Sequence, residues 1–239
     1  MKKVFATTRN VRAFYSAMEL INGQGRGKAE MALVSGVFGT GKTETCQKFA
    51  ADNDLIYVRA LDVMTRKSLL AAIAGELGEK TKGHSDTLYY RVVDRLIDRP
   101  QMLICDEVDY LVSKGIVEVL RDIYDHTNNP LVLVGMNEDL EREIKTKLPH
   151  LSDRWGAVVR FQRFEATDVR DIAAQICEVE LDDSAVEWIT THGEGRFRPI
   201  ERWFYQAEKL ARVNGLHTVS ALHLEPLKSK TNGRKKARR

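Results

Sequence analysis

The stretch that decides the fold is Gly36-Val37-Phe38-Gly39-Thr40-Gly41-Lys42-Thr43. Its spacing, Gly-x4-Gly-Lys-Thr, joins a flexible loop to one cation and one hydroxyl group. Glycines permit backbone conformations that are closed to residues with a Cβ atom, so successive N–H groups can converge on an anion. A helix that begins at the end of such a loop directs the positive end of its dipole to the same place. The stretch therefore predicts a phosphate-binding loop between a strand and a helix.

The residues on either side supply that context. Met31–Ser35 is a short apolar run that predicts a strand, and Glu44–Ala51 predicts the helix. We expect the loop to hold the phosphates of ATP, with Lys42 reaching the β- and γ-phosphates and Thr43 ligating Mg²⁺. The spacing arises by chance in roughly one unrelated chain of this size per hundred. A role unrelated to nucleotides is therefore disfavoured.

A second acidic motif completes the predicted site. The apolar run Met102–Cys105 ends in Asp106 and Glu107, at the strand end where ligands bind in open α/β sheets. We expect Asp106 to support the magnesium ion through water and Glu107 to polarise the attacking water as general base. Without the Gly-rich loop, the Asp-Glu pair could equally be the acidic start of a helix. Asp109, two residues further on, is interpreted as such a helix-start carboxylate. The Gly-rich loop about 65 residues upstream favours the nucleotide site.

The apolar pattern along the chain predicts an α/β fold with a five-stranded, mainly parallel sheet followed by a small helical lid. Strands are expected at 31–35, 55–60, 102–105, 131–134 and 158–161. Helices are expected at 10–22, 44–51, 69–77, 88–97, 168–179, 184–191 and 199–213, with a weaker apolar segment at 219–227. Thr65 or Ser68 is available to cap the helix at 69–77. The predicted parts are a nucleotide-binding domain at 1–165, a lid at 166–227 and a tail at 228–239.

Composition narrows the class of protein. The chain has 239 residues, 43% of them hydrophobic, and no apolar run approaches the roughly 20 residues that span a bilayer. The first residues lack the apolar stretch of a secretory signal. Cys46, Cys105 and Cys177 are odd in number and far apart, which fits neither a disulfide framework nor a zinc site. We therefore expect a protein of a reducing cytoplasm with no membrane partner.

The positive charge is concentrated at one end of the chain. The basic residues of the tail are Lys228, Lys230, Arg234, Lys235, Lys236, Arg238 and Arg239. Removing these seven from the net charge of +3 leaves −4 for the rest. Such a tail is expected to be disordered and to bind DNA by neutralising phosphates. A solubilising end without a partner is the alternative.

Five features taken together resemble the AAA+ ATPases of the P-loop NTPases. Two are the phosphate motifs, and the third is Leu131–Val134 followed by Gly-Met-Asn137, which resembles that family's fourth strand and polar sensor. The resemblance implies that Asn137 lies between the two motifs and orients the water. The segment Leu-Ser-Asp-Arg154-Trp resembles the one that carries an arginine finger, which completes a neighbouring subunit's site. Lys147 and Arg160 are the nearby alternatives.

The fifth feature is the segment Gly-Arg-Phe-Arg198-Pro, which resembles the start of the sensor-2 helix in the lid. The resemblance implies that Arg198 reaches back to the γ-phosphate. Ile200, Trp203 and Ala207 fall where that helix is apolar, and Arg196 fits the same pattern less well.

Residues 1–14 and the passage between the phosphate motifs narrow the resemblance to the phage Mu B transposition ATPases and their transposon relatives of the TnsC and TniB type. It implies ATP-dependent assembly on double-stranded DNA as a ring or helical filament, which presents target DNA to a transposase. The implied DNA contacts follow the second strand, at Arg66 and Lys67. Mu B also has separate DNA-binding domains before and after this core, and their roles are not carried over.

Two other functions remain open. A helicase loader or replication initiator would share the AAA+ core and DNA, and an added DNA-reading domain would favour it. A secretion-associated ATPase would be favoured by a membrane segment. A binding module that has lost hydrolysis is disfavoured because Lys42, Asp106 and Glu107 are all present.

Overall fold

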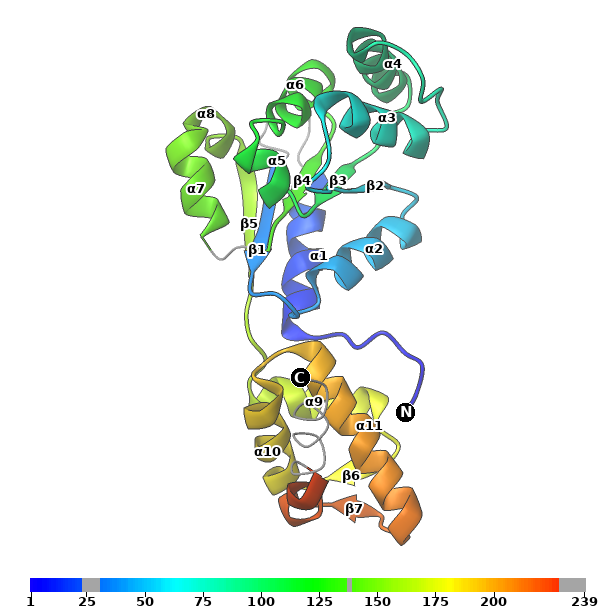
Figure 1. The fold of residues 1–239 in the computed structure, drawn as a ribbon, viewed down its shortest axis with the longest axis vertical. Coiled ribbons are helices and arrows are strands. Elements are labelled where there is room, and N and C mark those ends of the chain that lie inside the picture. The colour runs from blue at the N-terminus through cyan, green and yellow to red at the C-terminus, as the bar shows by residue number, and fades with distance from the viewer. Residues whose placement is uncertain (23–30, 137–138, 228–239) are drawn as a thin grey trace, which may run out of the picture. The chain divides into compact units, whose positions relative to one another are not determined.

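The computed structural model describes residues 1–22, 31–136 and 139–227, which divide into two compact units (Figure 1). One unit is Ala13–Phe161, and the other combines Met1–Arg12 with the chain from Gln162 onward. The boundary passes through helix α1 (Arg9–Asn22). Residues 1–12, which the sequence-based division placed with the nucleotide-binding domain, thus pack with the second unit. The side chain of Asn10 accepts a hydrogen bond from the Gln162 N–H at 3.0 Å and donates one to the Gln162 carbonyl at 2.9 Å.

The first unit is built on one parallel sheet. Its strands are β1 (Met31–Gly36), β2 (Ile56–Arg59), β3 (Leu103–Asp106), β4 (Leu131–Val134) and β5 (Trp155–Phe161), in the order β2-β3-β4-β1-β5. Every pair of neighbours is parallel. The predicted five-stranded sheet is therefore confirmed. The largest difference in bounds is at β5, which begins at Trp155 rather than at 158.

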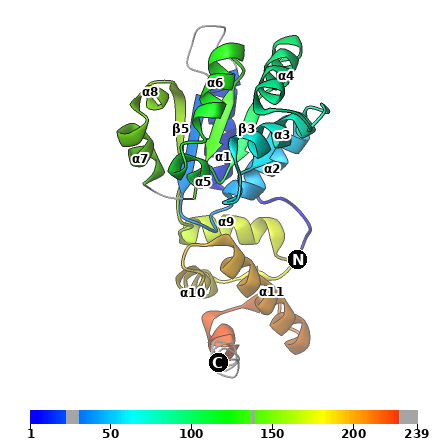
Figure 2. The ribbon, with the colours of Figure 1, turned by 45° about the horizontal axis from the view of Figure 1, so that its top comes forward.

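Alternate residues of the central strands enter two different cores, because successive side chains of a strand point to opposite faces. Met31 and Leu33 pack in one core, and Ala32 and Val34 pack in the other. The second core receives α1 and α2 (Lys42–Asp52). The first core receives α3 (Arg66–Glu76), α4 (Ser85–Asp98), α5 (Asp109–Ser113), α6 (Glu118–Thr127), α7 (Leu140–Lys147) and α8 (Pro149–Ser152). Figure 2 shows the sheet between these two sets of helices.

Helix α3 begins three residues before the predicted start at 69, because its cap is a reciprocal pair. The Thr65 hydroxyl accepts a hydrogen bond from the Ser68 N–H at 3.2 Å, and the Ser68 hydroxyl accepts one from the Thr65 N–H at 2.8 Å. Both residues that were predicted as alternative caps thus take part. This arrangement satisfies two backbone donors that a helix start would otherwise leave without a partner.

The second unit is mainly helical. It contains α9 (Ala166–Ile176), α10 (Asp183–Gly193) and α11 (Phe197–Asn214), and residues 221–227 are also helical. The prediction that strands stop after residue 165 was wrong, because β6 (Glu180–Leu181) and β7 (Thr218–Val219) form a short parallel pair. Two residues per strand are too few to produce a readable alternation. Residues 228–239, the predicted tail, lie outside the described residues.

None of the described helices combines the length and the apolar character needed to cross a membrane.

Cys46, Cys105 and Cys177 are all buried free thiols. Burial raises the pKa of the Cys177 thiol to about 12.

Candidate nucleotide-binding site

Strand β1 leads directly into the Gly-rich loop, and close packing against β5 fixes the first residue of that loop as glycine. Gly36 has φ 134°. A Cβ atom there would lie 2.3 Å from the carbonyl oxygen of Phe161, its register partner. At the other end, Gly41 caps α2 in the left-handed region with φ 95°. The Thr45 N–H and hydroxyl both donate to the Gly41 carbonyl, at 2.9 Å and 2.8 Å. The loop is thus held at both ends.

Lys42 lies folded against the loop. Its ammonium group donates to the carbonyl oxygens of Gly36 at 2.6 Å and Val37 at 2.9 Å, and the residue is only 6% exposed. The Thr40 hydroxyl also donates to the Val37 carbonyl, at 2.8 Å. Hydrogen bonds between an ammonium group and an anionic oxygen are stronger than those to a neutral carbonyl. A bound phosphate can therefore draw Lys42 away from these carbonyls.

The two predicted phosphate motifs are joined through one strand. Val134 of β4 is the register partner of both Val34 in β1 and Asp106 in β3. Because all three strands are parallel, their carboxyl ends meet at the same edge of the sheet. The segment after β4 therefore leaves from between the two motifs. Asn137, the predicted sensor on that segment, lies outside the described residues.

Asp106 is held by two donors. Its Oδ2 atom accepts the Tyr57 hydroxyl at 2.8 Å, and Oδ1 accepts the Glu107 N–H at 2.8 Å. The pKa of Tyr57 is raised, mainly because the residue is buried and secondly because the charge of Asp106 lies nearby. An ionised carboxylate offers about four acceptor positions, so Asp106 keeps the capacity to bind water.

The oxygen groups at these positions fit Mg²⁺, which usually keeps several waters and is bound by one or two carboxylates together with substrate phosphates. Asp106 supplies a carboxylate, and Thr43 supplies a half-exposed hydroxyl in the first turn of α2. No group of three His, Cys, Asp or Glu residues gathers as a metal cage within the described ranges. Magnesium at this site would therefore depend on the phosphates for the rest of its ligands.

Glu107 is held in an unusual position. Its backbone has φ 57°, a left-handed conformation that is uncommon for residues other than glycine. Its Oε1 atom lies 2.5 Å from Nη2 of Arg59, and the Glu107 side chain is 11% exposed against 52% for Arg59. The hydrogen bond to Glu107 raises the pKa of Arg59. The proposed general base is thus ion-paired within its own unit.

Tyr57 and Arg59 were missed by the sequence-based prediction. They are two positions apart on β2, and residues at that spacing share a face of a strand. Arg59 is the register partner of Asp106. The alternation of Tyr57 and Arg59 with the apolar residues Ile56 and Val58 was visible in the sequence. Placing them beside Asp106 required the strand order, in which β2 and β3 are neighbours.

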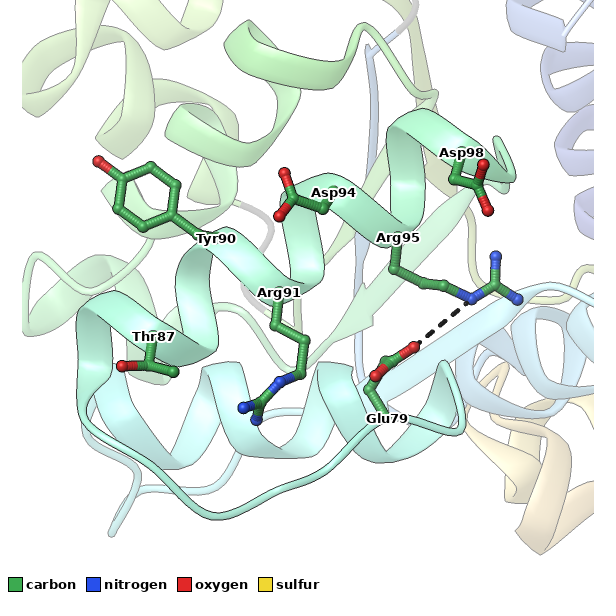
Figure 3. Close-up of a pocket in the computed structure, with 7 residues that line it drawn as sticks. All are labelled: Glu79, Thr87, Tyr90, Arg91, Asp94, Arg95 and Asp98. Atoms are coloured by element: carbon green, nitrogen blue, oxygen red, sulfur yellow. Dashed lines mark ion pairs between the residues drawn. The ribbon is translucent and has the colours of Figure 1, made fainter.

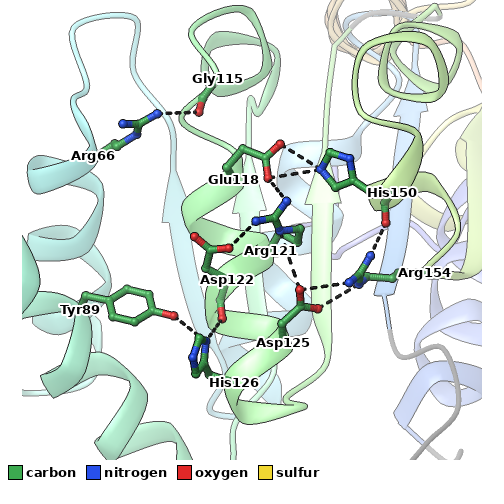
Figure 4. Close-up of polar contacts among 10 residues, drawn as sticks. All are labelled: Arg66, Tyr89, Gly115, Glu118, Arg121, Asp122, Asp125, His126, His150 and Arg154. Carbon is green, nitrogen blue, oxygen red and sulfur yellow. Dashed lines mark hydrogen bonds and ion pairs between the residues drawn. The ribbon is translucent and has the colours of Figure 1, made fainter.

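Arg154, the predicted arginine finger, is paired inside the first unit (Figure 4). Its Nε atom lies 2.9 Å from Oδ1 of Asp125, and its Nη2 atom lies 3.0 Å from Oδ2. A third donor, Nη1, bonds the carbonyl of His150. This two-point contact is the strong form of an arginine–carboxylate pair. A role in a neighbouring subunit would require the pair to open or to be shared.

The same corner of the unit contains several more charges. Arg121 lies 2.5 Å from Glu118 and 2.6 Å from Asp122, and His150 lies 3.0 Å from Glu118. The two alternatives to Arg154 are also paired. Lys147 contacts Glu143 at 2.7 Å, and Arg160 contacts Glu141. All three candidate cations therefore have a carboxylate partner in their own unit, and the choice among them stays a prediction.

Arg198, the predicted second sensor, is exposed in the first turn of α11. Ile200, Trp203 and Ala207 are buried in the core of the second unit, as the helix pattern predicted. Arg196 is the N-cap residue of α11 and pairs with Glu194. Contact of Arg198 with a nucleotide stays a prediction.

The predicted DNA contacts Arg66 and Lys67 are exposed at the start of α3. Arg66 donates a hydrogen bond to the Gly115 carbonyl at 3.5 Å. Lys114, which precedes Gly115 in the chain, forms an ion pair with Asp62 at 2.9 Å. In the loop before α3, Val63 is 83% exposed. The basic tail residues lie outside the described residues.

A hollow of about 570 Å³ lies on the surface of α4 (Figure 3). Its lining is Glu79, Thr87, Tyr90, Arg91, Asp94, Arg95 and Asp98. Charges of both signs alternate there, and none of the predicted nucleotide residues takes part. The hollow is therefore separate from the candidate site.

The fold and the site together define a P-loop protein with the AAA+ arrangement of strands. Residues 25–143 match the family model of an AAA domain, and this range includes both phosphate motifs. A Staphylococcus aureus protein named "Potential ATP-binding protein" is 27% identical over 197 residues, which cover 74% of this chain and 70% of that protein. These matches support ATP binding by this chain.

Solved structures show the same fold. The Aeropyrum pernix ORC1 protein, solved in complex with DNA, is 20% identical with a TM-score of 0.65 and covers 96% of this chain. The Thermotoga maritima RuvB Holliday junction branch migration motor is 20% identical with a TM-score of 0.59 and covers 93% of this chain. This chain spans 66% and 68% of those chains. Identity at this level shows the AAA+ fold and leaves the branch within AAA+ open.

Proposed function

We propose that this protein is a DNA-binding AAA+ ATPase that assembles on duplex DNA when ATP is bound and delivers that DNA to a transposase. The observation that supports it most is the joined site, in which β4 connects the Gly-rich loop to Asp106 and Glu107. The basic surface at Arg66 and Lys67 and the DNA complex of the similar ORC1 protein support DNA as the partner.

The residues divide the work of hydrolysing ATP to ADP and phosphate. The loop amides and Lys42 bind the phosphates, and Thr43 and Asp106 would hold Mg²⁺, which neutralises charge on the phosphate oxygens. Glu107 would accept a proton from the water that attacks the γ-phosphate. The ion pair between Glu107 and Arg59 opposes this proton transfer. The positive charge of Arg59 makes the Glu107 carboxylate a weaker acceptor for the proton of the attacking water. Release of Glu107 from Arg59 is therefore part of the proposal.

Assembly would supply the remaining charge. Arg154 of one subunit would stabilise the negative charge that develops on the γ-phosphate of its neighbour. A single subunit should then hydrolyse ATP slowly, and DNA should raise turnover by gathering subunits. Phosphate contacts fix position without specifying sequence, so binding should depend little on DNA sequence.

A replication initiator or helicase loader is the second candidate, and the ORC1 likeness favours it as much as it favours transposition. A secretion-associated ATPase has no such support. Two measurements separate the candidates. Electron microscopy with duplex DNA should show ordered assemblies only when ATP is present, and particles indifferent to DNA would contradict DNA as the partner.

Competition between unrelated duplexes of equal length is the second measurement. A target-capture protein should bind them with similar affinity, whereas an initiator should prefer one sequence strongly. ATP turnover measured with and without the cognate transposase then tests delivery directly. An unchanged rate would contradict that part of the proposal.

A further inference from the structure

The exposed face of α11, in the second unit, carries a straight row of four cations and one tyrosine. The row consists of the exposed residues Arg198, Arg202, Tyr205, Lys209 and Arg212. Their spacings of four, three, four and three residues place all of them within about 40° of one line along the helix. The opposite face is buried and contains Ile200, Trp203, Phe204, Ala207 and Ala211. We call the exposed row the α11 stripe.

The charge of the α11 stripe is not neutralised by the unit that carries it. Within residues 1–22, 31–136 and 139–227, none of its four cations forms an ion pair. Glu208 on the same helix is 8% exposed, and it accepts the Glu178 N–H at 2.9 Å inside the unit. Glu201 is the exposed carboxylate at the edge of the row. Four cations therefore face solvent with one exposed carboxylate on the same helix.

The exposed face of α4, by contrast, carries charges of both signs. On α4, Arg91 and Arg95 alternate with Asp94 and Asp98, and Arg95 also lies 3.9 Å from Glu79 (Figure 3). Like charges at a spacing of four residues destabilise a helix. The α11 stripe includes one such pair, Arg198 with Arg202, without the alternating carboxylates that α4 has. An anionic partner would remove this repulsion.

A regular row of this composition suits a polyanion. Arginine, lysine and tyrosine side chains all donate hydrogen bonds to phosphate oxygens. From Arg198 to Arg212 the row spans about 21 Å at 1.5 Å per residue, and duplex DNA presents one negative charge per about 1.7 Å of its axis. We propose that the α11 stripe, from Arg202 to Arg212, binds the phosphate backbone of duplex DNA, whereas Arg198 at its start belongs to the predicted nucleotide site. The inference rests on the proposed function for its partner, and it adds a DNA-binding surface on the second unit to the predicted contacts at Arg66 and Lys67.

The test uses the full chain with a non-hydrolysable ATP analogue and a short fluorescent duplex of arbitrary sequence. The variant is Arg202→Gln/Lys209→Gln/Arg212→Gln, which leaves Arg198 intact because that residue is assigned to the nucleotide site. Each lost phosphate contact should reduce the slope of log affinity against log salt by about 0.9. We therefore expect the slope to become less negative by about 2.7, with unchanged ATP binding. A second variant, Arg202→Lys/Arg212→Lys, keeps the charge and should retain the slope.

The matched control removes the same net charge from cations that are already paired. Lys48→Gln/Lys145→Gln/Arg170→Gln breaks contacts with Asp52, Glu141 and Asp183. It should leave the slope nearly unchanged, because these ammonium and guanidinium groups are held by carboxylates. Equal losses in the control and the stripe variant would overturn the inference by showing that only net charge matters.

Three further outcomes are decisive. A stripe variant that binds DNA with the wild-type slope overturns the inference and leaves the proposed function standing. Failure of the wild-type chain to bind duplex DNA at all overturns the proposed function and the inference with it. An unchanged slope together with an altered assembly mass in sedimentation would assign the stripe to contact between subunits, which also overturns it.

Discussion

The candidate catalytic cations of the first unit and the α11 stripe of the second unit differ in their partners. In the first unit, Arg59 and Arg154 are held by Glu107 and Asp125, and Lys42 is held by loop carbonyls. In the second unit, the α11 stripe has no such partners among the described residues. A cation that is already paired can change its partner only when a ligand or a neighbouring subunit competes for it. The difference indicates that the candidate catalytic cations of the first unit stay paired until a ligand or a subunit competes for them, whereas the α11 stripe is open to an anionic partner at all times.

The largest expected effect comes from Arg154→Ala. If Arg154 completes a neighbouring site, its loss should reduce DNA-stimulated hydrolysis by about 10³–10⁵-fold, with ATP affinity unchanged. Steady-state turnover with saturating DNA provides the measurement. Lys147→Ala and Arg160→Ala are the matched controls and should retain stimulation.

A mixing experiment shows whether Arg154 acts between subunits. Lys42→Ala should lose ATP binding because it removes the ammonium group that would contact the phosphates. Mixed with Arg154→Ala, it can still donate an intact Arg154 to a neighbour that binds ATP. Recovery of activity in the mixture is expected. Two inactive variants that stay inactive together would contradict action in trans.

Glu107→Gln comes next in size. Removing a positioned general base should slow hydrolysis by about 10²–10⁴-fold, while ATP binding and assembly on DNA persist. Single-turnover hydrolysis gives the rate, and electron microscopy should show assemblies that fail to disperse. Glu19→Gln, on the exposed face of α1, is the control. Hydrolysis at the wild-type rate would exclude Glu107 as the base.

A smaller effect on the hydrolysis rate tests whether Arg59 limits the activity of the proposed general base Glu107. Arg59→Ala frees the Glu107 carboxylate and should raise hydrolysis in the absence of DNA. Because the Arg59 side chain is 52% exposed, solvent screening limits such a pair to about 1 kcal/mol, which corresponds to at most about a fivefold rate increase. Arg99→Ala breaks an exposed pair with Asp54 and should change nothing. A lower rate in Arg59→Ala would show that Arg59 positions Glu107 for catalysis instead.

How far the sequence predicted this molecule depends on the range of the interactions. The loop from Gly36 to Thr43 and the strand that ends at Asp106 are local patterns, and both occur where expected. The ion pairs of Glu107 with Arg59 and of Arg154 with Asp125 join residues that are 48 and 29 positions apart. They follow from strand order and helix packing, which periodicity does not determine. The stripe on α11 was readable as a spacing, but its lack of partners required the folded surroundings.

The smallest prediction compares two helix caps, one in each unit. The Asp182 carboxylate accepts the Ala185 N–H at 2.8 Å at the start of α10, as Thr65 accepts the Ser68 N–H on α3. Loss of either cap, in Asp182→Ala or Thr65→Ala, should cost about 1 kcal/mol of unfolding free energy. Hydrogen exchange assigns each loss to a unit, and we expect Asp182→Ala to speed exchange in α10 while α3 is unaffected.

The two cap variants should differ in how their stability depends on pH. The hydrogen bond from Ser184 is the main cause that lowers the pKa of Asp182 below its ordinary value of 3.8. A carboxylate with a lowered folded-state pKa stabilises the fold above its unfolded-state pKa, and this contribution is lost as pH falls through the folded-state value. The loss of unfolding free energy in Asp182→Ala should therefore be largest at neutral pH. It should become smaller as the pH falls below the ordinary pKa of 3.8. Thr65 does not titrate, so the deficit of Thr65→Ala should persist over the same range. Equal behaviour of the two variants in acid would show that the Asp182 cap does not depend on its charge.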